Sequence, residues 1–116
     1  MVEGYVRIRT GEKKPVMAKP VALSGELVIN PAVAPVCSLY DFRGEEVPGM
    51  GEMLASGYET APLPSPKVWF NFDTLSPMEL SPGYYTLVFR ISVIGSDGLE
   101  RVFRPAVIVH VEKGCA

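Results

Sequence analysis

The sequence predicts an all-β fold, an antiparallel β-sandwich of about seven to eight short strands. The chain has 11 glycines and 11 prolines, together 22 of its 116 residues, and they are spread out, which indicates frequent turns. Between these turns, several runs alternate apolar with polar residues, the period of a half-buried strand. No segment shows an amphipathic helical pattern, and no internal repeat is visible.

The first third of the chain contains three short strand candidates. Residues 2–10 alternate and predict a strand with one solvated face. The apolar run 16–23 follows Pro15 and is interrupted by Pro20, so we place it at a sheet edge or a strand start, where a missing backbone donor is tolerated. Residues 26–31 form a short apolar run that ends in an Asn-Pro turn signal.

The middle of the chain predicts a strand, a tight turn and an irregular connection. Residues 33–42 form a longer strand candidate, and Asp41 with Gly44 predicts a turn in which glycine takes positive φ. Residues 48–66 are rich in glycine and proline, and we interpret them as a crossing connection within one domain. A short strand is expected near 53–55.

Residues 67–74 predict a strand with two distinct faces. Val68, Phe70 and Phe72 share one face, which we assign to the core, and Trp69 lies on the opposite face.

The C-terminal third predicts a long hairpin. Residues 80–93 enter through a turn and then place apolar residues at every second position. Asp97-Gly98 is a strong hairpin signal. The last strand, 99–112, contains Pro105, and we expect a bulge or a change of strand partner there.

Length, composition and charge limit the number of domains, the classes of partner and the expected location of the protein. We expect one domain over 1–116, with a frayed tail at 113–116. A net charge of −2 argues against binding to nucleic acid or to anionic membranes. No apolar run approaches the ~20 residues that span a bilayer, and the N-terminus lacks a secretion pattern. We therefore expect a cytoplasmic or virion protein, unless the chain is excised from a longer surface protein.

The turn that opens the 80–93 strand resembles a known structural motif. The sequence from Leu80 to Tyr85, with Pro82 and Gly83 between them, resembles the tyrosine corner of immunoglobulin-like and fibronectin type III-like sandwiches. The resemblance implies that the Tyr85 hydroxyl bonds to backbone a few residues upstream.

Other turns extend this resemblance over about three-quarters of the chain. The turns at 40–44 and 95–98 resemble hairpins of small Ig-like modules, such as those in bacteriophage tail and baseplate proteins and in microbial surface proteins. The paired cysteines of antibody domains are missing, and Trp69 falls in the wrong strand for their buried tryptophan.

No catalytic or zinc-binding pattern emerges, so the sequence predicts no enzyme and no cofactor. The single histidine, His110, is expected to be a solvated strand residue opposite the apolar face. Cys37 and Cys115 cannot compose a zinc site with one histidine. A bridge between them is one alternative, and a buried thiol with an exposed one is the other.

Two groups of acidic residues flank predicted turns. One group contains Asp41, Glu45 and Glu46, and the other contains Asp97 and Glu100. Such oxygens bind calcium at the loop ends of some sandwiches, but neither group has the density of a dedicated site. We interpret them as solvated turn acids and predict no metal.

An interaction surface is the remaining type of site. An outward Trp69 is a candidate interface anchor or sugar-stacking platform. Alternatively, the 48–66 connection covers it, with Met50 and Met53 as the covering side chains.

A second candidate surface is a small basic patch formed by three arginines, Arg90, Arg101 and Arg104. Alternatively, each of these arginines pairs with a nearby acidic side chain.

We therefore expect a non-catalytic structural or protein-interaction module of a larger assembly, with a protein partner or a second copy. A phage virion or tail is the leading context. The alternative is a carbohydrate- or ligand-binding accessory domain of a microbial surface or secreted protein, with Trp69 as the platform.

Overall fold

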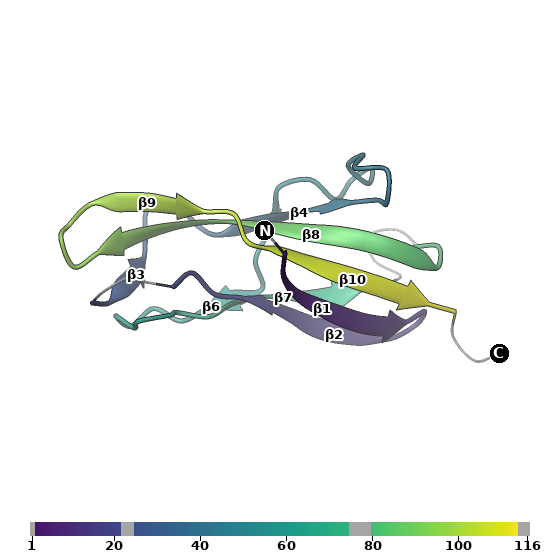
Figure 1. Ribbon diagram of the computed structural model, residues 1–116, viewed down its shortest axis with the longest axis horizontal. Helices are drawn as coiled ribbons and strands as arrows, with labels where there is room; N and C mark the ends of the chain where they lie inside the picture. The colour runs from purple at the N-terminus through teal and green to yellow at the C-terminus, as the bar shows by residue number, and fades with distance from the viewer. Residues whose placement is uncertain (1, 22–24, 75–79, 114–116) are drawn as a thin grey trace.

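The computed structural model describes residues 2–21, 25–74 and 80–113. These residues form ten strands and no helix, which confirms the all-β prediction (Figure 1). In chain order the strands are β1 (Val2–Arg9), β2 (Lys13–Ala18), β3 (Leu27–Ile29), β4 (Val36–Tyr40), β5 (Met53–Leu54), β6 (Gly57–Tyr58), β7 (Val68–Asp73), β8 (Gly83–Gly95), β9 (Glu100–Phe103) and β10 (Ala106–Glu112).

The number of strands exceeds the seven to eight that the sequence predicts. The 48–66 connection contributes two strands of two residues each, β5 and β6, where one was expected. The last apolar run is divided at Pro105 into β9 and β10, because proline cannot donate a ladder hydrogen bond.

The strands form two sheets. The larger sheet has the order β1-β10-β8-β4-β5, with β3 and β9 paired to the far end of β8, and the smaller sheet has the order β2-β7-β6. Figure 1 shows the smaller sheet lying along one side of the larger one. All pairs are antiparallel except β1 with β10, which are parallel. The prediction of a wholly antiparallel arrangement is therefore wrong at β1.

The central strand of the larger sheet is β8, the stretch that the sequence marks as most regular. Its first part lies between β10 and β4, and its last part lies between β9 and β3. The alternate residues Leu87, Phe89, Ile91 and Val93 are fully buried, as the period of two predicts.

Pro105 is accommodated without a bulge. On β8, Ile91 pairs with Phe103 and Val88 pairs with Ala106, so neither strand gains a residue across the proline. The backbone N–H of Phe89 donates to the Pro105 carbonyl at 2.9 Å. The predicted bulge is therefore absent along β8. A change of partner does occur at Pro105, because β9 is paired with β8 and β10 is paired with both β8 and β1, whose register shifts between Val2 and Gly4.

Turn and edge predictions are confirmed at three places. Pro15 lies in β2, at the edge of the smaller sheet. Gly44 has φ 81° in the turn where its N–H bonds to the Asp41 carbonyl at 3.0 Å. Gly98 has φ 80° in the β8–β9 hairpin.

Both sheets contribute to one hydrophobic core. The smaller sheet buries Val16, Val68 and Phe72, and Phe70 is half-buried against the same cluster. The described chain is elongated, with Cα extents of 52 × 22 × 22 Å. Cys37 lies inside the core, and its burial raises the pKa of its thiol to about 12. The predicted frayed tail and Cys115 fall, apart from Lys113, outside the described residues.

Candidate interaction surface

The predicted tyrosine-corner residues shape the entrance to β8. The Tyr85 hydroxyl donates to the Ser81 carbonyl at 2.7 Å, the upstream backbone bond that the resemblance implies. Leu80 is buried in the core, and Pro82 precedes Gly83 at the start of the strand. Desolvation, and then the charge of Asp41, raise the pKa of Tyr85.

Trp69 is half-buried, and its ring lies over the backbone of the neighbouring strand β6. Its ring lies so close to Gly57 of β6 that a Cβ atom at residue 57 would overlap it. This contact favours the alternative interpretation, in which the 48–66 connection covers the tryptophan. Met50 lies inside the core and Met53 packs against the core, and the backbone at Gly57 approaches the ring closely.

The three predicted patch arginines do not come together. Arg90 bonds Glu52 at 3.0 Å, and Arg104 lines the same hollow as Arg90. Arg101 lies opposite Val93 and pairs with Asp97 at 2.8 Å. Because side chains alternate along β9, Arg101 projects from the other side of the sheet.

The outer side of the larger sheet carries a group of large, partly exposed side chains. They lie at outward positions of β1, β4, β8 and β10 and in the turn that follows β4. We define them as the aromatic face: Tyr5, Tyr40, Phe42, Tyr84, Ile108 and His110.

His110 lies at one end of the aromatic face, between Tyr5 and Tyr84. Its ring stacks on Tyr84 with 4.2 Å between ring centroids and 10° between planes. The Tyr5 hydroxyl lies 3.0 Å from its Nδ1. The His110 side chain is only 23% exposed. The predicted position of His110 opposite the apolar face is confirmed, but two tyrosines partly cover the imidazole, so it is less solvated than expected.

An ion pair borders the same end of the aromatic face. The Arg7 Nε donates to Glu112 at 2.6 Å, and this bond lowers the pKa of the Glu112 carboxyl. Desolvation, and then the neighbouring Tyr84, raise the pKa of Tyr5. The Tyr5 hydroxyl therefore remains a neutral hydrogen-bonding group at physiological pH.

A shallow hollow of about 480 Å³ lies in the middle of the aromatic face. Its lining includes Tyr40, Phe42, Tyr84 and Ile108. The side chains that surround it are mainly apolar or aromatic, which suits contact with another apolar surface.

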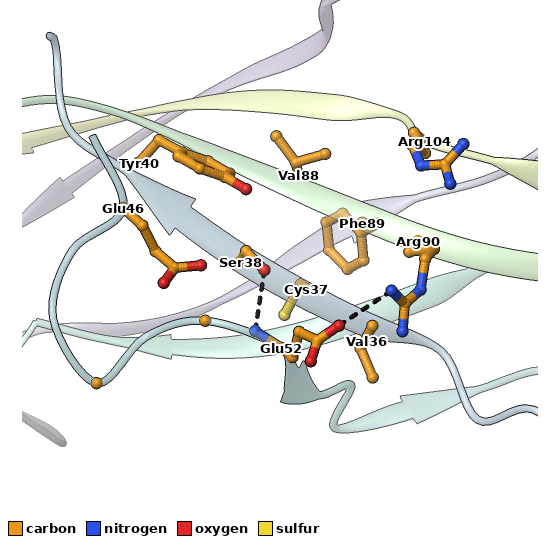
Figure 2. Close-up of a pocket in the computed structure, with 12 residues that line it drawn as sticks. Val36, Cys37, Ser38, Tyr40, Glu46, Glu52, Val88, Phe89, Arg90 and Arg104 are labelled. Atoms are coloured by element: carbon orange, nitrogen blue, oxygen red, sulfur yellow. Dashed lines mark hydrogen bonds and ion pairs between the residues drawn. The ribbon is translucent and has the colours of Figure 1, made fainter. Parts of the chain in front are cut away.

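A second hollow, of about 620 Å³, adjoins the first, since Tyr40 and Val88 line both. Figure 2 shows its walls, formed by β4, by β8 and by the segment 46–52. We call it the charged hollow because four charged side chains line it: Glu46, Glu52, Arg90 and Arg104.

The acidic side chains of the two turns accept hydrogen bonds from the backbone of the same turns. Asp41 Oδ1 accepts from the N–H groups of Arg43 and Glu45 at 2.9 and 3.0 Å. Asp97 Oδ1 accepts from the N–H of Leu99 at 3.0 Å. Across the described ranges, no group of three or more histidine, cysteine or acidic residues is placed to hold a metal ion.

Sequence reasoning missed the aromatic face although its signal is present. Alternation along β8 already placed Tyr84 on the side away from the core. Tyr5 and Tyr40 occupy equivalent outward positions of their own strands. What the sequence does not contain is the strand order that brings these positions side by side.

Comparison with known proteins adds no relative. The chain matches no known family, and it matches no curated protein. In the part of the chain that the structure describes, no helix is long and apolar enough to cross a membrane.

Proposed function

We propose that the chain is a non-catalytic Ig-like module that acts as a protein-interaction or structural part of a larger assembly, through its aromatic face. The strand order supports the fold part of this proposal. Strands β2, β7 and β6 follow the order B-E-D of Ig domains, and β10, β8, β4 and β5 follow the order G-F-C-C′. The Tyr85 bond to Ser81 stands at the entrance of the strand equivalent to F.

The uneven distribution of exposed apolar side chains supports the proposed role in protein interaction. Among the described residues, nine large hydrophobic side chains are exposed. Five of the nine lie on the outer side of the larger sheet or in its turn: Tyr5, Phe42, Leu54, Tyr84 and Val102.

Exposed tyrosine and phenylalanine are enriched at protein interfaces because they bury a large apolar area with few rotatable bonds. Phe42 is 81% exposed and Tyr84 is 53% exposed, so both are available to a partner. A contiguous group of exposed apolar side chains is more often a contact surface than a surface that stays in solvent. The virion or tail context stays a prediction that follows from the resemblance alone.

Site-specific photocrosslinking tests this proposal. A benzophenone side chain replaces Tyr84 in one variant and Met17 in another. Met17 is the matched control, because it is 56% exposed but lies on the outer side of the smaller sheet. Both variants are irradiated as purified protein and in extract of the cells that produce the chain.

The proposal expects a discrete adduct from the Tyr84 position that unlabelled wild-type protein competes away. An adduct with a second copy would assign self-association, and one with another protein would assign a hetero-partner. Equal adducts from both positions, or none from the Tyr84 position, would overturn the proposal.

A further inference from the structure

The charged hollow differs from the aromatic face in the chemistry of its walls. Two carboxylates, Glu46 and Glu52, face two guanidinium groups, Arg90 and Arg104, so its formal charge sums to zero. Its volume of about 620 Å³ lies in the range of small-molecule sites. The two acids would repel an anion and the two arginines would repel a cation, so the hollow favours a neutral, polar ligand.

One wall is held in a fixed geometry by Glu52. Its N–H donates to Ser38 Oγ at 2.9 Å, and its carboxylate accepts from Arg90 Nη1 at 3.0 Å (Figure 2). Glu52 has φ 47°, the one positive value at a non-glycine residue in the described ranges. Such backbone strain persists where the surroundings fix it, and it is concentrated at functional sites.

The neighbouring backbone is adapted to this wall. Gly49 has φ 78°, a conformation that favours glycine. The Glu46 carboxylate lies against Gly51, where a Cβ atom would overlap it. Glycines thus allow the segment to pass close to an acidic side chain that lines the hollow (Figure 2).

The other walls add a hydroxyl, an aromatic ring and a second donor. Tyr40 is half-buried on β4, and Figure 2 shows its ring at one end of the hollow. Arg104 is exposed at the rim, and no ion pair is recorded for it among the described side chains. Its guanidinium donors are therefore open to a ligand.

We propose that the charged hollow binds a short neutral oligosaccharide. Sugar hydroxyls both donate and accept, so neighbouring hydroxyls can bond to Glu52 and Arg90, whose acceptor and donor lie side by side. The aliphatic face of a sugar ring can pack on Tyr40. The adjoining hollow, which shares Tyr40 and Val88, gives room for a further sugar unit. The charged hollow does not include Tyr84, but it adjoins the aromatic face and shares Tyr40 with it.

Titration followed by ¹H–¹⁵N NMR of the full chain tests this proposal. The neutral probes are the hexamers of β-1,4-glucose, α-1,4-glucose, xylose, mannose and N-acetylglucosamine, each at millimolar concentration. A hexamer of galacturonic acid is the anionic comparison. At least one neutral probe is expected to give saturable shifts at the amides of Ser38, Gly49, Gly51 and Glu52.

Two variants and one control link the shifts to the hollow. Glu52→Asn removes the carboxylate while asparagine tolerates positive φ, and Arg104→Gln removes an exposed donor. Each is expected to weaken binding at least tenfold with an otherwise unchanged spectrum. Met17→Ser, on the other sheet, is expected to bind as wild type.

Several results would overturn the proposal. These are no saturable shift with any neutral hexamer, shifts centred on Trp69, or binding of galacturonate alone. Unchanged affinity in both Glu52→Asn and Arg104→Gln would also overturn it, since two walls of the hollow would then be dispensable.

Discussion

The outer sides of the two sheets differ although their inner sides are alike. Both sheets bury aliphatic and aromatic residues in one core. The smaller sheet presents Lys13 paired with Asp73 at 3.5 Å and one exposed methionine, Met17. The larger sheet presents the aromatic face. Packing of the core does not determine which residues occupy the outward positions of a sheet. The difference between the two outer sides therefore points to a role in contact with other molecules.

The tryptophan of the smaller sheet sharpens this comparison. Trp69 is an outward residue of β7, yet its ring packs onto the backbone of the neighbouring strand at Gly57 and is half-buried. Tyr84 stacks one face of its ring on His110 and still remains 53% exposed. An aromatic residue at an outward position therefore contributes to stability on one sheet and is available for contact on the other.

The first predicted effect is on association through the aromatic face. Phe42→Ser combined with Tyr84→Ser removes two exposed rings, and we expect at least a tenfold loss of partner binding, about 1.4 kcal/mol. The crosslinked adduct provides the partner, and titration calorimetry or fluorescence anisotropy gives the Kd.

Met17→Ser is the matched control for that double variant. Its affinity should stay within about twofold of wild type, because Met17 lies on the smaller sheet. Equal losses in the control and in the double variant would remove the distinction between the two outer sides.

The next effect concerns the cover over Trp69. Gly57→Ala places a Cβ where the ring lies, so the ring or the strand must shift. We expect a loss of about 1–3 kcal/mol in the free energy of unfolding, as for other overpacked sites. Urea denaturation followed by tryptophan fluorescence measures it, and an unchanged midpoint would mean that Gly57 does not hold the ring.

Tyr85→Phe should have a smaller effect. The substitution removes the hydroxyl that bonds the Ser81 carbonyl and keeps the half-buried ring. We expect a loss of about 1 kcal/mol in unfolding free energy. Chemical denaturation compares the two proteins, and a negligible change would argue against a tyrosine-corner role.

The smallest effect is a pH dependence at the β8–β9 hairpin. The Arg101 side-chain bond, followed by the Leu99 N–H, lowers the pKa of Asp97 to about 2, below its ordinary 3.8. Because the folded pKa is the lower one, the stabilisation is present above about pH 4 and is lost as the pH falls toward 2.

Asp97→Asn should therefore reduce stability slightly at neutral pH and flatten its decline between about pH 4 and pH 2. Thermal unfolding of both proteins across this window measures the difference. Parallel curves for the two proteins would show that Asp97 does not contribute to the acid response.

Local features were predictable from the sequence because they depend on neighbouring residues. The alternation in β8, the turn at Asp41 and Gly44, and the edge position of Pro15 each follow from chemistry within a few residues. The two-residue strands β5 and β6 were harder to predict, since so short a segment carries no period.

The candidate surfaces depend on pairing between distant strands, which no local pattern contains. His110 meets Tyr84 because β10 and β8 pair in one register, and it meets Tyr5 because β1 joins in parallel. The same pairing separates Arg101 from Arg104. Sequence reasoning chose Trp69 because its strand was clear, but the residues that cover it lie in an irregular connection.

A paired measurement of stability tests the central claim, that the aromatic face is free for contact while the smaller sheet's aromatic residue is structural. Urea unfolding of Trp69→Ala and Tyr84→Ala at neutral pH compares one outward ring from each sheet. The account predicts a loss of about 2–3 kcal/mol for Trp69→Ala and less than about 1 kcal/mol for Tyr84→Ala. An equal or larger loss for Tyr84→Ala would contradict it.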